Sequence, residues 1–356
     1  MDVGLTFDDI LLVPQYSEVT SRKRCNISVD FLGERLRSPF IPANMDTITS
    51  VEMLTLTMKR FGLGFMHRFM PLNEQVAFVR DAIETVYDED ESTLPRFTPL
   101  TIGVTESVED LASILSKPIW ENQVSGFSRR INLVLVDVAH AHSVNVERRV
   151  KWLKENFPDI KVIVGNIATR HAFLSVVDWG ADAVKVGIGN GSICSTRLTT
   201  GCGMPQITAI KEINSARIDA GYSYDTFPII ADGGMRHYGD AAKALAAGAN
   251  MVMSGYFFAG CPETPGDQID KCKAYRGMAS KEAREDWEPL KLKDHTPEGV
   301  SRWVNVKPSA EIIFIEAEQA LRSTMSYCGV TTIENLYRDS KVLRQTGRSA
   351  VEGRTI

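Results

Sequence analysis

Short apolar runs alternate with amphipathic segments along most of this chain. Eight runs end in small or polar residues, at positions 40–43, 63–66, 100–104, 133–138, 162–165, 183–188, 228–231 and 250–254. Between most of them, apolar residues recur at helical spacing, at positions 50–61, 74–85, 144–156, 168–178, 205–220 and 239–247. Strands that alternate with helices predict a parallel sheet, and near-continuous apolar strands fit burial on both faces.

Eight strand–helix units in about 250 residues predict a TIM (β/α)8 barrel. A doubly wound open sheet has the same periodicity and is the alternative, because the pattern does not reveal whether the sheet closes. We expect one α/β barrel domain over residues 1–356. In a barrel, the loops that follow the strands carry the chemistry.

Three segments follow the eighth run. Residues 261–303 are rich in proline, glycine and charge, which predicts a mobile flap over the strand ends. Residues 310–327 have helical spacing, and the helix is expected to end near Gly329. The tail, residues 340–356, is polar and basic, so we expect it either to be disordered or to pack on a neighbouring subunit.

Composition narrows the functional classes. A formal charge of −5 argues against a dominant role on nucleic acid or membrane surfaces. No apolar run approaches the roughly 20 residues of a membrane helix, and the first residues do not form a secretion signal, which predicts a cytoplasmic protein. Six scattered cysteines without metal-ligand spacing predict free thiols.

The turn at residues 186–196 carries the most informative chemistry, because it places Cys194 behind Gly187, Gly189 and Gly191. Glycines permit positive φ, and the inward-facing amides or carbonyls of such a turn suit a phosphate or a cation. A turn that lowers the pKa of the thiol below its usual value of roughly 8.5 would make Cys194 a nucleophile. A buried, unreactive cysteine beside an ordinary turn is the competing interpretation.

Polar groups also follow the other predicted strands. Asp232-Gly233-Gly234 follows the seventh strand and Gly255 the eighth, where barrels often hold a phosphate through main-chain amides. Asp232 is suited to accept hydrogen bonds from ribose hydroxyls, although Asp-Gly-Gly is also an ordinary turn. His140 and His142 lack a third ligand at metal spacing, which favours hydrogen bonding or substrate contact.

Seven motifs make the chain similar to the IMP dehydrogenase/GMP reductase family over nearly its whole length. They are LTFDDILLVP (5–14), NMDT (44–47), VGIGNGSICST (186–196), DGG (232–234), ETPG (263–266), YRGM (275–278) and LRS (321–323). The resemblance implies a TIM barrel, a purine nucleoside monophosphate as substrate, a nicotinamide dinucleotide and a homotetramer.

Other segments bear on the branch of the family. Dehydrogenases of this family usually carry a pair of CBS modules between the second and third barrel units, where this chain has only residues 81–99. Segments 43–47, 66–68 and 323–327 resemble reductases, and the Arg-Tyr pair of the dehydrogenase flap is not found in residues 278–300. Segments 263–266, 275–278 and 297–299 resemble dehydrogenases instead. The resemblance favours a GMP reductase, with an IMP dehydrogenase lacking CBS modules as the alternative.

A GMP reductase uses NADPH to convert GMP to IMP and ammonia. By resemblance, Cys194 bonds covalently to the purine, and Thr196 and Glu263 handle protons; a glutamate in a partly dry pocket can have its pKa raised toward neutrality, which suits that work. The other implied roles are Asp232 for ribose; Ser192, Gly234, Gly255 and Tyr275 for phosphate; Met278 for the base; Asp137 and Asn166 for the dinucleotide; and the carbonyls of Gly189, Gly191 and Cys194 for a monovalent cation such as potassium.

Two residues depart from the family pattern. Asn190 stands where reductases usually have proline, and Tyr256 where the family usually has a small phosphate-binding residue. Tyr256 predicts a narrowed or redirected phosphate pocket and a less usual purine monophosphate as substrate. Two other classes stay open: a catalytically silent nucleotide-binding regulator, and a flavin-dependent barrel oxidoreductase, which would have no need for Cys194.

Overall fold

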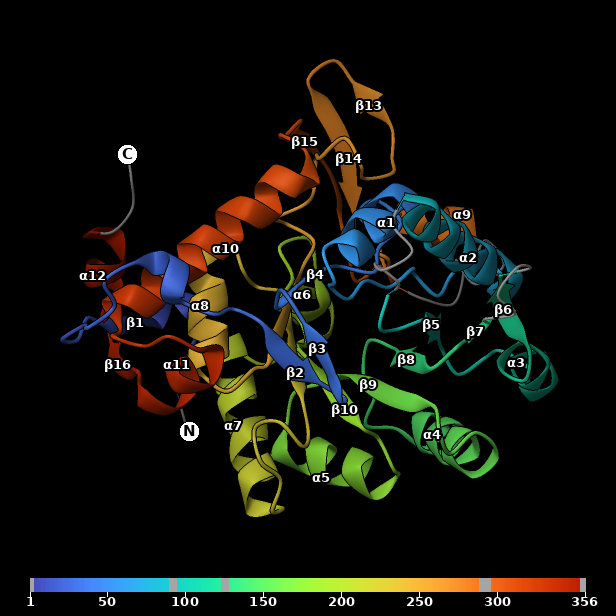
Figure 1. Cartoon of the computed structure of the whole chain (residues 1–356), viewed down its shortest axis with the longest axis horizontal. Coiled ribbons are helices and arrows are strands. Elements are labelled where there is room, and N and C mark those ends of the chain that lie inside the picture. Colours follow the sequence, from blue (N-terminus) through green and yellow to red (C-terminus); the bar gives the residue numbers. More distant parts are fainter. Residues whose placement is uncertain (1–2, 90–94, 123–127, 288–295, 353–356) are drawn as a thin grey trace.

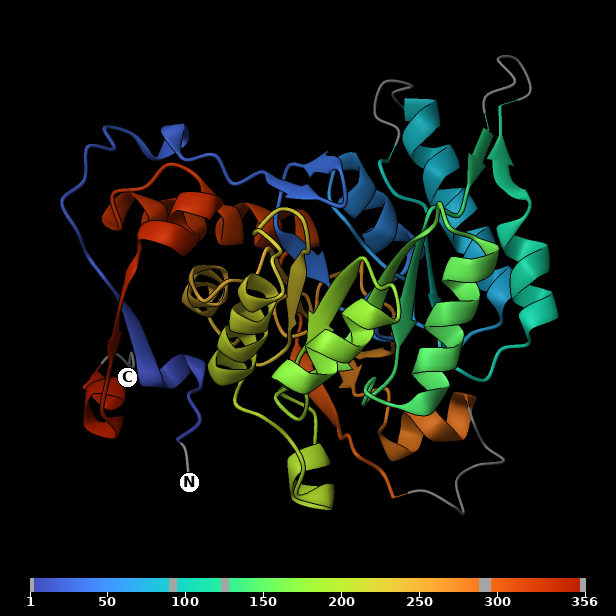
Figure 2. The same cartoon turned by 90° about the horizontal axis from the view of Figure 1, so that it is seen from below.

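The computed structural model describes residues 3–89, 95–122, 128–287 and 296–352. At its centre seven parallel strands form a curled sheet, and helices lie around the outside (Figures 1 and 2). In spatial order the strands are β4 (Phe40–Pro42), β12 (Met251–Ser254), β11 (Ile229–Asp232), β10 (Ala183–Val186), β9 (Lys161–Ile167), β8 (Leu133–Asp137) and β5 (Pro99–Ile102). These strands correspond to seven of the eight predicted runs, and the arrangement confirms the α/β TIM-barrel class.

Seven of the described helices lie between or after these strands; six match the segments predicted from periodicity, and α3 was not predicted. They are α1 (Val51–Lys59), α2 (Leu72–Glu89), α3 (Val108–Leu115), α4 (Val144–Asn156), α5 (Arg170–Asp178), α7 (Gln206–Asp219) and α8 (Tyr238–Ala246). In α1 the Ser50 hydroxyl caps the first turn by accepting from the Met53 amide at 3.1 Å. Met53, Leu54 and Met58 of this helix are buried, as expected for its inward face.

The predicted strand at residues 63–66 is wrong, because these residues join no hydrogen-bonded ladder. They lie between α1 and α2 in the chain, and the flanking strands β4 and β5 are the two edges of the sheet. Leu63 and Phe65 are nevertheless buried. Gly64 packs closely on α1, since a Cβ there would lie 3.0 Å from Leu54 Cδ1, so helix packing holds this segment.

The flap, residues 261–303, is more regular than expected. Its described part contains a three-stranded antiparallel sheet and a helix: β13 (Gln268–Ile269), β14 (Cys272–Arg276), β15 (Ser301–Asn305) and α9 (Lys281–Trp287). The sheet projects from the barrel in Figure 1. Residues 288–295 lie outside the described residues. The mobility of the flap stays a prediction.

Both ends of the described chain meet beside α8. The predicted helix at residues 310–327 is confirmed as α10 (Ala310–Tyr327), and α11 (Ile333–Asp339) follows Gly329. In the tail, β16 (Lys341–Arg344) pairs with β1 (Ile10–Val13), and α12 (Gly347–Glu352) comes next (Figure 2). Disorder is therefore the wrong prediction for residues 341–344, because they pair with β1 of the same chain. Packing of the tail on a neighbouring subunit stays a prediction. Residues 353–356 lie outside the described part.

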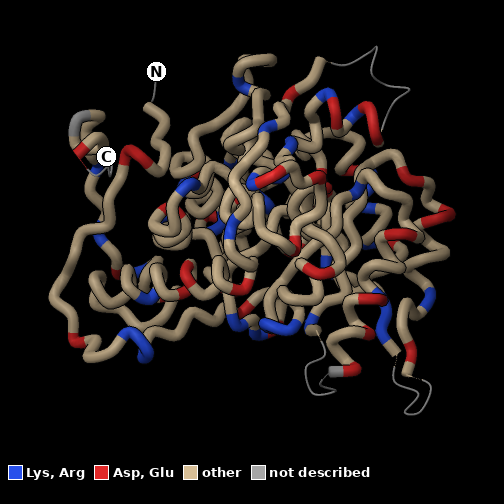
Figure 3. The backbone as a smooth tube through the Cα atoms, turned by 90° about the horizontal axis from the view of Figure 1, so that it is seen from above, with Lys and Arg blue, Asp and Glu red and all other residues tan. Residues whose placement is uncertain are grey.

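Small elements complete the described chain: the short helices η1 (Phe7–Asp9), η2 (Arg22–Arg24) and α6 (Thr196–Thr200), and two hairpins, β2 (Val29–Phe31) with β3 (Glu34–Leu36) and β6 (Pro118–Glu121) with β7 (Ser128–Arg130). Acidic and basic residues are interspersed along the backbone (Figure 3). Among the described helices, none is long and apolar enough to span a bilayer.

Candidate active site

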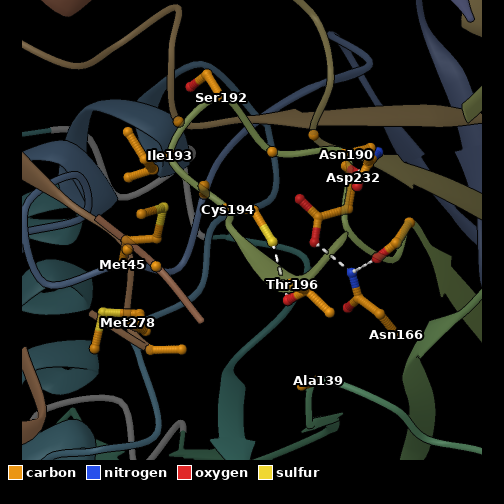
Figure 4. Close-up of a pocket in the computed structure, with 18 of the residues that line it drawn as sticks. Met45, Ala139, Asn166, Asn190, Ser192, Ile193, Cys194, Thr196, Asp232 and Met278 are labelled. Carbon is orange, nitrogen blue, oxygen red and sulfur yellow. Dashed lines mark hydrogen bonds between the residues drawn. The ribbon is translucent and has the colours of Figure 1, made fainter. Parts of the chain in front are cut away.

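A cavity of about 310 Å³ opens at the carboxyl ends of the sheet strands (Figure 4). Its walls come from the segments that follow six of the seven strands and from the flap. The position and size fit a ligand site in a barrel. Every predicted site residue lines this cavity except Glu263.

Cys194 lies exposed in the loop between β10 and α6. Main-chain hydrogen bonds fix this loop to flap residues 298–300: the Ser195 amide donates to the Glu298 carbonyl at 2.9 Å, and the Val300 amide donates to the Ile193 carbonyl at 3.0 Å. Gly187 and Gly189 adopt positive φ, as predicted for the turn, whereas Gly191 does not. The thiol is therefore presented to the cavity rather than packed in the core.

A series of hydrogen bonds leads from this thiol to a carboxylate. Cys194 Sγ donates to Thr196 Oγ1 at 3.2 Å, and the Thr196 hydroxyl donates to Glu298 Oε2 at 2.9 Å. Figure 4 shows the first of these contacts. A carboxylate at the end of such a series can take a proton from the thiol side and return one to a leaving group.

Glu263 lies elsewhere. Its Oε2 accepts from the Ala310 amide at 2.8 Å, at the start of α10, and its carbonyl accepts from the Ser50 hydroxyl at 2.7 Å. The N-cap residue Ser309 makes no side-chain capping bond. Glu263 therefore caps α10, because it accepts from one of the first amides, which have no acceptor within the helix. The structure does not bring Glu263 to Thr196; Glu298 occupies that place.

Lys185 forms a buried charge network on the cavity floor. Its Nζ lies 3.0 Å from Asp137 Oδ1 and 2.6 Å from Asp232 Oδ2. Asn44 donates to the other oxygen of Asp137 at 2.9 Å, and Asn166 donates to Asp232 Oδ2 at 3.0 Å (Figure 4). The network joins side chains from β8, β9, β10 and β11 and from the loop after β4, so it fixes the predicted dinucleotide and ribose residues relative to one another.

The sequence makes room for this lysine. A Cβ on Gly165, in the neighbouring strand, would lie 2.5 Å from Lys185 Cβ, so only glycine fits there. The pairing of β9 with β10 also shifts at this level: Lys185 faces Gly165 and Val186 faces Ile167. Asn166 is therefore the extra residue of a bulge, and its amide turns to Asp232.

Electrostatics keeps the network charged. Burial by itself would lower the pKa of Lys185, but Asp137 and Asp232 outweigh burial and raise it above its usual value. Burial would likewise raise the pKa of Asp137, but the Lys185 ammonium and the Asn44 amide hold it below the usual range. A carboxylate therefore faces the cavity at neutral pH.

Ser192, Gly234, Gly255 and Tyr275 meet at the proposed phosphate end. The hydroxyls of Ser192 and Tyr275 lie 3.4 Å apart, and burial raises the pKa of Tyr275 to about 12. A Cβ on Gly255 would lie 2.7 Å from the Tyr275 hydroxyl, which explains why glycine stands there. Tyr256 is 41% exposed beside them, and the Lys307 ammonium lies 4.9 Å from its ring centroid.

Met278, Met45 and Ile193 form an apolar wall on the Cys194 side of the cavity (Figure 4). Flap contacts hold this wall in place. Asp46 Oδ2 accepts from Arg276 Nη2 at 2.7 Å and from Trp287 Nε1 at 2.8 Å. An apolar wall opposite fixed polar groups is the usual construction of a site for an aromatic base.

The His67 ring packs on Trp287, with centroids 4.9 Å apart. Burial lowers the pKa of His67 to about 4, against the opposing effect of Asp46. His67 is therefore neutral at physiological pH and serves the docking of the flap as an aromatic contact.

The predicted cation ligands are main-chain carbonyls of the cysteine loop. Such oxygens suit a hard monovalent cation. The Gly191 carbonyl accepts from the Cys194 amide at 3.1 Å and keeps its second lone pair. The donor set fits the cation, whose presence stays a proposal.

The described residues contain no group of three or more histidines, cysteines or acids able to hold a metal. His142 Nε2 lies 3.0 Å from Ser175 Oγ, in agreement with the expected hydrogen-bonding role. All six cysteines are free, as predicted.

Sequence reasoning missed three cavity residues: Lys185, Arg284 and Glu298. Lys185 had a signal, because a charge in the middle of a continuous apolar strand requires a buried partner. Glu298 had a weaker one, because it belongs to segment 297–299, which resembles dehydrogenases. Arg284 lies on a short flap helix with no pattern that points to the cavity.

Comparisons with known proteins agree with the geometry. The sequence model of the IMP dehydrogenase / GMP reductase domain matches residues 4–355. The inosine-5'-monophosphate dehydrogenase of Cryptosporidium parvum is 34% identical over 96% of this chain and 92% of that protein. The GMP reductase of Bacillus thuringiensis subsp. konkukian is 33% identical over 94% of each chain, and that of Oceanobacillus iheyensis is 34% identical over 92% of each.

Proposed function

The chain belongs to the IMP dehydrogenase/GMP reductase family, whose members are oxidoreductases acting on purine nucleotides, and we propose that it is a GMP reductase that uses NADPH. In this proposal it converts GMP to IMP and ammonia through a covalent bond at Cys194. The series Cys194–Thr196–Glu298 is the observation that carries the proposal, because it joins a thiol and a carboxylate at the cavity wall.

The chemistry follows from what C2 of the purine must undergo. The Cys194 thiolate adds to C2, and Glu298, acting through Thr196, supplies the proton with which the amino group leaves as ammonia. The thioimidate on Cys194 then accepts hydride at C2, and the C–S bond breaks to give IMP and the free thiolate. A bound NADPH supplies that hydride.

The other residues bind and orient. Asp232, with one oxygen held by Lys185 and Asn166, offers its other oxygen to the ribose hydroxyls. Ser192, Gly234, Gly255 and Tyr275 bind the phosphate, and Met278 contacts the base. Asp137 and Asn166 stay on the dinucleotide side in this proposal, with Asn166 also fixing Asp232.

The dehydrogenase alternative, oxidation of IMP to XMP with NAD, has a specific basis. The chain matches a dehydrogenase and two reductases at 33–34% identity. The same thiol and Thr196–Glu298 pair suit either direction, since hydrolysis of the covalent intermediate also needs proton transfer.

One assay separates the two reactions. Purified protein is incubated with GMP and NADPH, and separately with IMP and NAD⁺, while reduced-nicotinamide absorbance and ammonia release are followed. Oxidation of NADPH with ammonia release in the first mixture alone supports the reductase. Reduction of NAD⁺ in the second alone supports the dehydrogenase, and bound yellow chromophore on purification would point to a flavin enzyme instead.

Tyr256 supports the further proposal that the substrate is a less usual purine monophosphate. Tyr256 lines the cavity next to Gly255, and Lys307 donates to its carbonyl and to that of Phe257. Turnover of a panel of purine monophosphates tests this. A kcat/KM for GMP equal to that of ordinary reductases would remove the reason for it.

Three further properties of the family are proposed for this chain: it is located in the cytoplasm, it forms a homotetramer, and potassium activates it. Sedimentation of the purified protein measures the assembly state, fractionation of cells locates the protein, and turnover in potassium against a bulky organic cation measures the activation. Equal rates in both salts would argue against the carbonyl site at Gly189, Gly191 and Cys194.

A further inference from the structure

The side chain of Asn190 leaves the cysteine loop and reaches the turn that follows β11. Its Nδ2 donates to the Asp232 carbonyl at 2.9 Å, across 42 positions of the chain. Figure 4 shows Asn190 and Asp232 next to each other on the cavity wall. Asn190 comes shortly before Cys194, and Asp232 leads directly into Gly233 and Gly234. This hydrogen bond therefore joins the loop that carries the thiol to the turn proposed to bind ribose and phosphate.

Glycines leave room for the Asn190 amide. A Cβ on Gly187, just after β10, would lie 3.0 Å from Asn190 Nδ2, and one on Gly234 would lie 3.4 Å from the same atom. Gly233 and Gly234 adopt φ of 81° and 80°, a conformation that glycine takes without steric cost. The amide therefore packs directly against main chain from both strand ends.

The Asp232 carbonyl is held by two side-chain amides. Gln206, buried at the start of α7, donates from Nε2 to this carbonyl at 3.2 Å and to the Val186 carbonyl at 2.8 Å. Asn190 supplies the other donor, so both lone pairs of the oxygen are used. Since the Gln206 bonds do not involve Asn190, removal of the Asn190 amide should release the cysteine loop without unfolding the turn.

Asparagine gives this loop a different support from the proline that reductases of the family usually have at position 190. Proline fixes its own φ and offers no side-chain donor. A loop with proline is stiffened from within, whereas this loop is fixed by a bond to another segment. The position of the Cys194 thiol therefore depends on the position of the Asp232 turn.

We propose that Asn190 is a positioning residue that aligns the Cys194 thiol with the purine ring of the bound nucleotide. The assignment rests on the covalent chemistry of the proposed function and holds for either direction of the reaction. The bonds of the thiol to Thr196 and of Thr196 to Glu298 do not involve Asn190. Without the Asn190 amide, the thiol should keep its own reactivity but meet C2 at the wrong distance and angle. Misplacement of a reacting atom by about 1 Å can cost about 10²-fold in rate.

The test compares Asn190→Ala and Asn190→Asp with the unaltered protein. The aspartate keeps the shape of the side chain but has no N–H to donate to the Asp232 carbonyl at neutral pH. Asn156→Ala is the matched control, because Asn156 is exposed at the end of α4 and donates to the Trp152 carbonyl of its own helix.

Three measurements are made on each protein. Steady-state turnover gives kcat and the KM for the nucleotide. Alkylation by iodoacetamide without nucleotide, followed at Cys194 by mass spectrometry, gives the reactivity of the thiol itself. Thermal unfolding verifies that each variant folds.

We expect both Asn190 variants to lower kcat by about 10–100-fold, to leave KM within about threefold and to leave the alkylation rate within about twofold. Asn156→Ala should change none of these values.

Three results would overturn the positioning role alone: an unchanged kcat, a rise in KM at constant kcat, or alkylation that slows in parallel with kcat. The second would limit Asn190 to nucleotide binding, and the third would mean that it acts on the acidity or exposure of the thiol. If the unaltered protein turns over neither GMP nor IMP, the proposed function fails, and the role of Asn190 with it.

Discussion

Asp232 and Glu298 both bring carboxylates to one cavity, but they reach it by different routes. Asp232 ends the core strand β11, and its partners Lys185 and Asn166 come from the next two strands on one side of it, β10 and β9. Glu298 lies in the flap, far along the chain from its partner Thr196, and main-chain bonds to the Cys194 loop hold it there.

The difference concerns what must fold first. The Lys185 network is complete once the parallel strands pair, because strand order and register fix its members. The Cys194–Thr196–Glu298 series is complete only when the flap docks. We therefore expect changes in the Lys185 network to act on folding, and changes in the series to act on turnover with little loss of stability.

The strongest expected effect comes from Cys194→Ala, which removes the nucleophile and leaves Thr196 and Glu298 in place. Turnover should fall by about 10⁴-fold or more, and mass spectrometry with nucleotide should no longer trap an adduct at this position. The midpoint of thermal unfolding should stay unchanged, because the side chain is exposed. A variant that keeps full turnover, or keeps its cellular role without turnover, would support the silent regulator.

The two glutamates give the next largest contrast. Glu298→Gln should lower kcat by about 10²–10⁴-fold, because the amide cannot exchange a proton with Thr196. Glu263→Gln is the matched control: it should leave kcat within about threefold and cost about 1 kcal/mol of unfolding free energy at the start of α10. The reverse ranking in steady-state kinetics would return the catalytic role to Glu263.

Lys185→Met tests the strand side. It leaves Asp137 and Asp232 facing each other without their cation, so the free energy of unfolding should fall by about 3–5 kcal/mol in urea titrations. Lys161→Gln removes an exposed lysine that lies 3.5 Å from Asp182, and it should cost less than about 1 kcal/mol. Equal costs for the two variants would mean that the buried network contributes no more than a surface pair.

The smallest expected effect is the contribution of His67, which packs on the flap, to the pH dependence of stability. Burial lowers the pKa of His67 to about 4 in the folded chain. In the unfolded chain this histidine takes up a proton near pH 6.5, so between these values only the unfolded chain is protonated there. The stability of the protein should therefore fall as pH drops from about 6.5 toward 4. At pH 5 the loss specific to His67 should be about 2 kcal/mol.

The measurement compares chemical unfolding of the protein and of His67→Phe at pH 7.5 and pH 5. Phenylalanine keeps a ring against Trp287 but takes no proton, so this variant should lose less stability on acidification. His171→Phe, at an exposed position of α5, should behave like the unaltered protein. Parallel losses in all three proteins would contradict the contribution of His67.

The sequence predicts the positions of residues on core strands better than those of residues held by long-range contacts. Apolar periodicity predicts seven strands and most of the helices after them, because burial determines those patterns. It also places Cys194, Asp232 and Asn166 at one edge, since the ends of parallel strands share it. The run at 63–66 has the same pattern, but close packing of Gly64 on α1 replaces strand pairing there, and no periodicity distinguishes the two.

The partner of Thr196 was beyond such reasoning. Glu263 and Glu298 both lie in the flap; motif resemblance points to Glu263, whereas the structure brings Glu298 to Thr196. Their separation depends on the open amide of Ala310, which takes Glu263, and on the main-chain pairing of residues 298–300 with the cysteine loop. Both are long-range contacts, which neither local spacing nor hydrophobic pattern records.

That pairing has a consequence for how the sulfur meets foreign chemicals. Any movement that lifts residues 298–300 off the cysteine loop removes the Glu298 carboxylate in the same step, which leaves the sulfur with Thr196 but no proton acceptor behind it. Electrophilic reagents should therefore modify Cys194 more slowly when residues 298–300 are lifted off the loop than when they are bound to it.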